Sequence, residues 1–282
     1  MKRRHFLQQA GLLAAGSADA WAGGERSQRE GEQERRGRFP RDSRRKSVLI
    51  TSAHTNLARG LAAGLAPNYE LRLTAPEPVD TAHEFVRCSL DHSELTAEVV
   101  RGVDAVVHVT EPSLHPRAPD AVDYATRCTY NLLQAAVNGG VKSIVYLSSL
   151  RMMGGYDEHF QVDEQWRPRP TPESGGLAEY LGEFTCREFA RDGRIPVVVL
   201  RLADIVSGSP ASEGGSPTAW VAPGDVARAV NSALSKLLDD GEARFGDWSV
   251  FHIVSHCPSG RFPTRKAQRI LDDRPSSGGE EQ

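Results

Sequence analysis

Short apolar runs alternate with longer amphipathic segments from residue 46 onward. The runs span five to seven residues and are apolar throughout, as strands buried on both faces are. The segments between them place apolar residues at helical spacing. The predicted strands are Ser47–Thr51, Glu70–Thr74, Glu84–Cys88, Ala105–Val109, Ser143–Leu147, Val197–Leu202 and Val250–Val254, and the predicted helices are Leu57–Leu65, Glu94–Arg101, Ala121–Asn138, Leu177–Arg191 and Val226–Leu238. This alternation predicts an α/β fold: a Rossmann-type doubly wound parallel sheet in a single domain, residues 46–272, with a short C-terminal substrate region.

The N-terminal residues follow a different pattern. Residues 1–22 place Arg3 and Arg4 before a mildly apolar, Ala/Gly-rich run and two A-x-A sites. This resembles a bacterial twin-arginine export signal, which predicts a periplasmic or other extracytoplasmic location. A basic, Ala-rich amphipathic helix is the alternative.

Charged residues of both signs alternate in residues 23–45, where Phe39 is the only large apolar side chain. Such a segment buries too little surface to offset its chain entropy, so we expect a disordered linker. A basic patch for anionic surfaces, from Arg35 to Lys46, is the sharper alternative. Residues 273–282 are predicted to form a disordered tail.

Composition narrows the function classes. The 34 Lys+Arg against 37 Asp+Glu give a net charge of −3, which argues against a nucleic-acid partner. No run of about 18 apolar residues occurs, so we expect no membrane span. His252 and His256 are four residues apart, and the run Val250–Val254 is predicted to be a strand. Four residues of extended chain span roughly 13 Å, so we expect no metal site.

Four cysteines are spread along the chain, and none forms a C-x-x-C pair. Because a zinc knuckle needs C-x-x-C pairs, we expect no such site. The spacing does not show whether any two cysteines form a disulfide. Buried thiols and one bridged pair both remain open for Cys88, Cys128, Cys186 and Cys257.

The first predicted strand runs into a turn and a helix, which is where this fold binds the phosphates of a dinucleotide. Glycines in that turn let the backbone approach a pyrophosphate, and the helix N-terminus favours the anion. Here the turn reads Ser52-Ala53-His54-Thr55-Asn56, and no glycine follows before Gly60. The architecture of a phosphate site is present without its glycines.

Five segments of the domain follow one another in a family-specific order. They are VLITSAHTNLARGLAAGL from Val48, Gly102–His108, Thr129–Ala136, Val141–Ser149 and Ala219–Arg228. Together they resemble the extended short-chain dehydrogenase/reductases, that is, the NAD-dependent epimerase/dehydratase family. The resemblance covers about residues 46–275, and its last segment is similar to uronate dehydrogenase-like members. It implies NAD or NADP as cofactor, a small-molecule substrate, and often a homodimer.

Carried onto this chain, the family's cofactor positions are degenerate. The three glycines of its T-G-x-x-G-x-x-G motif fall on Ser52, Thr55 and Ala58. Threonine at the middle place is costly if its φ is positive, and its side chain takes space that a phosphate would use. The acidic residue that binds the adenosine ribose falls on Ala75. The positional candidates for cofactor binding are Ser52, His54, Thr55, Asn56, Leu57, Ala75, Ser89 and Leu90.

The family's catalytic Ser/Thr, Tyr and Lys are also missing. They fall on Leu150, Gly175 and Glu179, and no Y-x-x-x-K occurs anywhere in a chain with only five lysines. A Glu in place of the Lys raises the pKa of a nearby phenol rather than lowering it.

Three candidates for catalysis remain, namely Ser149, Glu179 and Tyr180. In the competing interpretation, Tyr180, Leu181 and Phe184 pack inward while Glu179 and Glu183 face water. The loop Arg151–Tyr156 is expected to line the cleft.

Two functions follow from these residues. The first is an exported family-like pseudoenzyme that lacks standard dehydrogenase chemistry and binds a small ligand or a partner in the crevice. It would need no cofactor. The alternative is an active NAD(P)-dependent oxidoreductase or epimerase that acts on a sugar acid or nucleotide sugar with a non-standard site.

Overall fold

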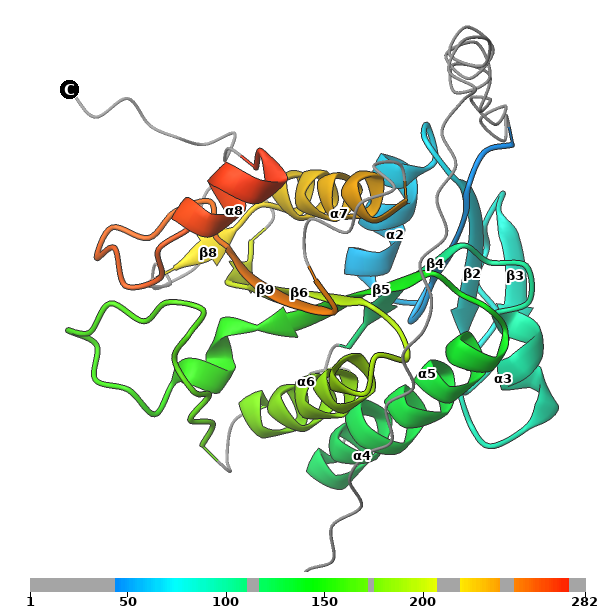
Figure 1. Ribbon diagram of the computed structural model, residues 1–282, viewed down its shortest axis with the longest axis horizontal. Helices are drawn as coiled ribbons and strands as arrows, with labels where there is room; N and C mark the ends of the chain where they lie inside the picture. The colour runs from blue at the N-terminus through cyan, green and yellow to red at the C-terminus, as the bar shows by residue number, and fades with distance from the viewer. Residues whose placement is uncertain (1–43, 111–116, 172–174, 207–218, 239–245, 274–282) are drawn as a thin grey trace, which may run out of the picture. The chain divides into compact units, whose positions relative to one another are not determined.

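The computed structural model describes residues 44–110, 117–171, 175–206, 219–238 and 246–273. Seven strands form one sheet in the order β3-β2-β1-β4-β5-β6-β9, and every neighbouring pair is parallel (Figure 1). The strands are β1 (Ser47–Ile50), β2 (Glu70–Ala75), β3 (Glu84–Arg87), β4 (Ala105–Val109), β5 (Ser143–Ser149), β6 (Val197–Leu202) and β9 (Trp248–Ile253). This confirms the predicted Rossmann-type sheet. Its order reverses between β1 and β4, where such sheets open a crevice at their carboxyl ends.

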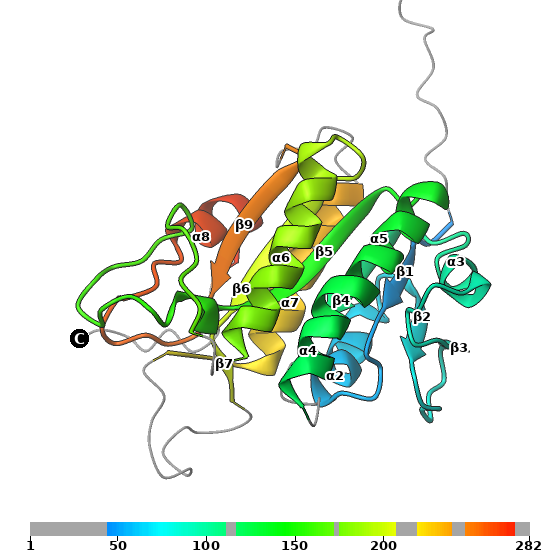
Figure 2. The ribbon, with the colours of Figure 1, turned by 90° about the horizontal axis from the view of Figure 1, so that it is seen from below.

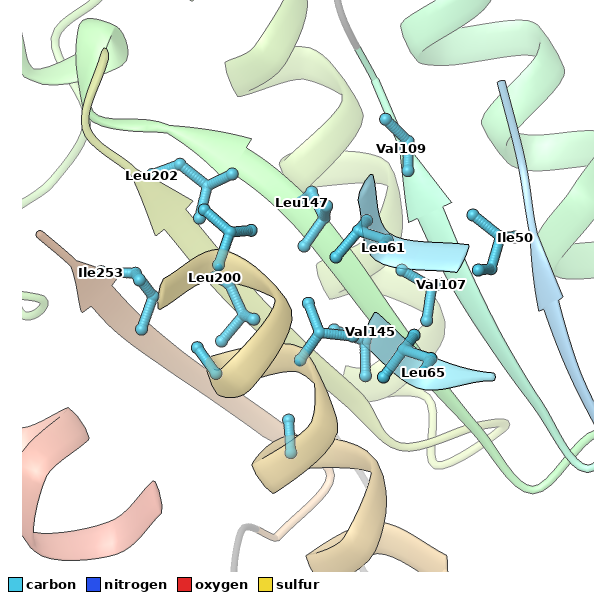
Figure 3. Packing of buried hydrophobic residues seen from close by; sticks show 14 of the residues in the cluster. Ile50, Leu61, Leu65, Val107, Val109, Val145, Leu147, Leu200, Leu202 and Ile253 are labelled. Atoms are coloured by element: carbon cyan, nitrogen blue, oxygen red, sulfur yellow. The ribbon is translucent and has the colours of Figure 1, made fainter. Parts of the chain in front are cut away.

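Helices cover both faces of the sheet, which is why the central strands β1, β4, β5 and β6 are largely apolar and almost entirely buried. One face carries α2 (Asn56–Leu65), α7 (Pro223–Leu238) and α8 (Arg265–Leu271), and the other carries α3 (Glu94–Val99), α4 (Ala118–Asp123), α5 (Thr129–Asn138) and α6 (Gly176–Arg191) (Figures 1 and 2). Figure 3 shows Leu61 and Leu65 of α2 lying against branched side chains of β1, β4 and β5. The apolar cores on the two faces fix the parallel strands in place, so the carboxyl ends of all seven strands lie along the same edge of the sheet.

The structure corrects the predicted helix Ala121–Asn138. The helix begins at Ala118 and is interrupted by a π-helical turn over Tyr124–Cys128 before α5. Such π turns insert an extra residue and often occur at functional sites. The sequence pattern missed this turn because the apolar positions on either side of it still read as one helix.

Four short elements have no counterpart in the prediction. They are the 3₁₀ helix η3 (Leu150–Met153), the two-stranded sheet of β7 (Asp204–Ile205) and β8 (Trp220–Val221), and α8. All but α8 are too short to show a period. Two of them, η3 and β7, directly follow β5 and β6 and therefore shape the carboxyl edge of the sheet.

Close packing of α6 against the π turn gives a first prediction. A Cβ on Gly182 would lie 2.1 Å from the Tyr146 hydroxyl and 2.9 Å from the Ala125 carbonyl oxygen, so Gly182→Ala is expected to destabilise the fold by about 1–3 kcal/mol. Gly60→Ala is the matched control, because a Cβ there meets nothing within 4 Å. It is expected to stabilise α2 by up to about 1 kcal/mol. Urea unfolding measures both, and equal effects would contradict this packing.

Both predicted terminal segments fall largely outside the structure. The signal of residues 1–22, most of the linker of residues 23–45 and most of the tail of residues 273–282 lie outside the described residues. In the part that is described, no helix has the length and apolar character needed to cross a bilayer. The four cysteines are free thiols, three of them buried and Cys257 half-buried.

Candidate functional site

The turn after β1 has its strained residue at Ser52 and not at Thr55. Ser52 has a φ of 55°, whereas Thr55 has an extended backbone with a φ of −83°. Strain at Thr55, expected for a positive φ, is therefore absent. The Thr55 Oγ1 instead accepts a hydrogen bond from the Ala58 amide at 3.0 Å and caps α2. That bond uses one of the helix N-terminal amides with which this fold otherwise binds phosphate.

A tyrosine from the π turn reaches the point where β1 and β4 diverge. The Tyr124 hydroxyl lies 2.8 Å from Ser52 Oγ, which also donates to the Val109 carbonyl at 2.8 Å. Beneath it, His108 hydrogen-bonds Thr51 at 2.8 Å and Thr129 at 2.9 Å. The pyrophosphate of a dinucleotide would pass over this point. At this point the polar side chains of the protein already hydrogen-bond one another, so they are not free to bind a phosphate.

The side of the crevice that would hold an adenosine is apolar or open. Ala75 ends β2 and is buried, so the acidic partner for a ribose is missing. Leu90 is buried with a φ of 55°, and Ser89 is exposed. His54 and Asn56 also face outward. Together with the Thr55 cap and the Tyr124 contact, these residues do not fit a bound dinucleotide.

Two neighbouring cavities lie over the carboxyl ends of β5 and β6. Their volumes are about 220 and about 150 Å³. The larger one also reaches Tyr156, Glu158 and Arg261, and the smaller one reaches Leu57 and Glu179. Both are lined by Ser149, Arg151, Leu202, Ala203 and Asp204. Together they form a polar crevice at the edge where this fold binds ligands.

Glu179 is the most unusual group in this crevice. It stands in the first turn of α6, only 6% exposed, and its Oε2 is buried with no hydrogen-bond partner among the described residues. Burial raises the pKa of Glu179 to about 7, although the Arg151 charge and a hydrogen bond from the Ser149 side chain oppose the rise. Close to neutral pH, this carboxyl can hold or release a proton.

The structure brings two of the three catalytic candidates together. Ser149 and Glu179 line the same cavity. Tyr180 packs elsewhere, against the buried cluster of Met152, Met153 and Val162. Of the predicted loop, Arg151, Gly154 and Tyr156 line the crevice, as expected.

The expectation that Glu179 and Glu183 face water is wrong. Glu183 is 5% exposed and forms a buried ion pair with Arg201 of β6 at 2.5 Å. Ser148 donates to the same carboxylate at 3.1 Å. Phe184, expected to pack inward, is 41% exposed. Glu183 lies on the buried side of α6, beside apolar residues such as Cys186 and Phe189, because β5 and β6 offer its carboxylate a serine and an arginine.

Three charged residues line the crevice but were not among the sequence candidates, namely Asp204, Glu158 and Arg261. Asp204 binds Arg151, with Nε at 3.0 Å and Nη2 at 2.9 Å from Asp204 Oδ1. Its place just beyond a buried strand was a usable signal. Glu158 and Arg261 gave no such signal, and neither did Tyr124, which lines neither cavity.

Comparison with known proteins supports the family reading of the sequence. Residues 50–247 match the model of the NAD dependent epimerase/dehydratase family. The uronate dehydrogenase of Pseudomonas syringae pv. tomato is 29% identical over 163 residues, which are 55% of this chain and 58% of that protein. An NAD-dependent glucose-6-phosphate dehydrogenase of Haloferax volcanii is 25% identical over 189 residues, 59% of this chain and 71% of that one. The chain thus spans less than two-thirds of the uronate dehydrogenases it matches.

Solved structures share the fold. The uronate dehydrogenase from Agrobacterium tumefaciens superposes with a TM-score of 0.70 at 22% identity and covers 82% of this chain and 84% of its own. A variant of that enzyme complexed with NAD superposes with a TM-score of 0.69, at the same identity and coverage. At this identity the likeness concerns the fold, and the chemistry must be argued from this chain's own residues.

Proposed function

Since the chain belongs to the NAD-dependent epimerase/dehydratase family, we propose that it keeps the family's ligand crevice without its dinucleotide-dependent hydride chemistry. One observation carries this proposal: the position of the family's lysine holds Glu179, a buried acid inside the crevice. In the family the ammonium group of that lysine lowers the pKa of the catalytic phenol and binds the ribose of the cofactor. A carboxyl group at the same place can do neither. Leu150 and Gly175 stand where the hydroxyl partners would be, which leaves the reaction without its proton donor.

We place a small hydroxy acid of the uronate type in the crevice. Arg151 and Arg261 line it and supply guanidinium donors suited to the carboxylate and hydroxyl oxygens of such an acid, and Ser149 supplies a hydroxyl. Arg261 is held in place by its Nη2 bond to the Tyr156 carbonyl at 2.7 Å and by its stacking on Phe262. The names of the related uronate dehydrogenases point to the same ligand class.

Calorimetric titration of the full chain with D-glucuronate and D-galacturonate tests this function. Binding at about 1 mM or tighter is expected, with no reduction of NAD or NADP. Arg261→Met is expected to weaken binding about tenfold, because a charged hydrogen bond is lost. Arg265→Met serves as control, since Arg265 lies outside both cavities. Turnover of either sugar acid with NAD would contradict the proposal and favour the active oxidoreductase.

Export by the twin-arginine route and assembly as a homodimer remain predictions of the sequence. The first rests on Arg3 and Arg4, outside the described residues. A protein exported in this way folds in the cytoplasm, which is compatible with the free thiols of the fold.

A further inference from the structure

We propose that Glu179, Ser149 and Arg151 form a subsite for the carboxylate of the bound acid. In this subsite the protonated Glu179 side chain donates a hydrogen bond to that carboxylate. This inference rests on the proposed function and adds the group that recognises the ligand's charge. It also makes binding of the acid depend on pH.

The subsite follows from three donors that converge on the smaller cavity. Ser149 and Arg151 end β5 and begin η3, and Glu179 faces them from α6. Glu179 Oε2 is the one carboxyl oxygen in this cavity recorded as buried without a hydrogen bond, within the described part of the chain. A buried polar atom left in this state costs about 1–3 kcal/mol, and a ligand atom bonded to it removes that cost.

Arg151 keeps donors for a ligand despite its pairing. Asp204 Oδ1 takes the Nε and one Nη2 hydrogen of the guanidinium, which carries five N–H donors in all. Ser149 Oγ accepts from the Arg151 amide at 3.1 Å, and its own hydrogen bonds Glu179. The hydroxyl can rotate to donate that hydrogen to a ligand carboxylate instead. The subsite thus presents donors, as an anion requires.

Burial is the main reason that the pKa of Glu179 is raised, and the charges facing it modify this effect. Arg151 on η3 favours the carboxylate form, whereas Asp204 on β7 and Glu183 on α6 itself oppose it. Beneath it, the buried Tyr146 of β5 is uncharged, because burial raises the pKa of its phenol. With one cation against two anions and little water, Glu179 keeps its proton to about neutral pH.

A proton-bearing carboxyl is a hydrogen-bond donor, and an ionised one is not. Below about pH 7, Glu179 can therefore bond the carboxylate of a sugar acid, which stays ionised there. Above that pH two carboxylates face each other and repel. Binding of the anion should consequently take up a proton and weaken as the pH rises.

The test is calorimetric titration of the full chain with D-glucuronate and with D-glucuronamide, its uncharged amide. If only the protonated form binds, glucuronate affinity should fall on the order of 30-fold from about pH 6 to about pH 8.5. Glucuronamide should show no such fall. Titration in buffers of different ionisation enthalpy should show proton uptake near one per glucuronate at about pH 8.

Glu179→Gln removes the titrating group and keeps an N–H donor. Its affinity for glucuronate is expected to change less than about threefold over the same range, with no proton uptake. Glu188→Gln, on the same helix but outside both cavities, should keep the wild-type pH dependence. Glucuronate binding with the same affinity at both pH values overturns the subsite and leaves the proposed function standing. Absence of binding at both pH values overturns the proposed function, and the subsite with it.

Discussion

Replacing Glu183 with alanine is expected to lower the free energy of unfolding by about 3–5 kcal/mol. The side chains of Arg201 and Glu183 are 3% and 6% exposed, and the guanidinium donates to both carboxylate oxygens, at 2.5 and 3.0 Å. Without the carboxylate, the Arg201 guanidinium has one side-chain hydrogen-bond partner left among the described residues. That partner is the sulfur of Met153, at 4.0 Å. An unpaired buried cation is the reason for the large cost.

Urea unfolding followed by circular dichroism measures this loss. Glu188→Ala is the control on the same helix, because Glu188 pairs with Arg191 at the surface, and its loss should cost at most about 1 kcal/mol. The double variant Glu183→Leu/Arg201→Met should recover most of the loss, because it buries no unpaired charge. A cost below about 1 kcal/mol for Glu183→Ala would contradict the buried pair.

Glu179→Gln is expected to stabilise the fold relative to the wild type, increasingly so as the pH rises. The folded state raises the pKa of Glu179 from 4.5 to about 7, so between these values it binds a proton that the unfolded chain has released. Wild-type stability therefore loses about 2–3 kcal/mol between about pH 5 and about pH 8 through this group. Glutamine does not titrate, so the variant escapes this loss.

The measurement is the difference in unfolding free energy between variant and wild type at each pH, since shared groups cancel. It should grow by about 2–3 kcal/mol in favour of Glu179→Gln from about pH 5 to about pH 8. Glu158→Gln, at an exposed glutamate of the larger cavity, is the comparison variant and removes one carboxylate of the crevice without touching the buried one. A difference that stays flat with pH for Glu179→Gln would show that its carboxyl is ionised and solvated in the fold.

Much of the fold could be predicted from hydrophobic pattern alone. The predicted bounds of Ala105–Val109 and Val197–Leu202 agree with the structure at every residue, because strands covered on both faces are mostly apolar. Helix α8 and the π turn could not be placed. Helix α8 is too short to show a helical period and is fixed by contacts with distant parts of the chain. The π turn changes the backbone hydrogen bonding but leaves the spacing of the apolar residues the same.

The candidate site was predictable where it follows a strand. Ser149 and Glu179 were found as positions at the end of β5 and the start of α6, and the structure places them in one cavity. The burial of Glu179 could not be predicted, because a charged residue in a helix usually faces water. Only the arrangement of β5 and β6 shows that Glu179 and Glu183 lie on the buried side of α6, together with its core residues.

Titration of the full chain with NAD and with NADP in a calorimeter tests the central claim most directly. Three features of the crevice disfavour dinucleotide binding. They are the Thr55 cap, the Tyr124 contact with Ser52, and Ala75 at the end of β2. The account predicts no saturable heat for either nucleotide up to about 1 mM. A dissociation constant in the micromolar range for either one would contradict it.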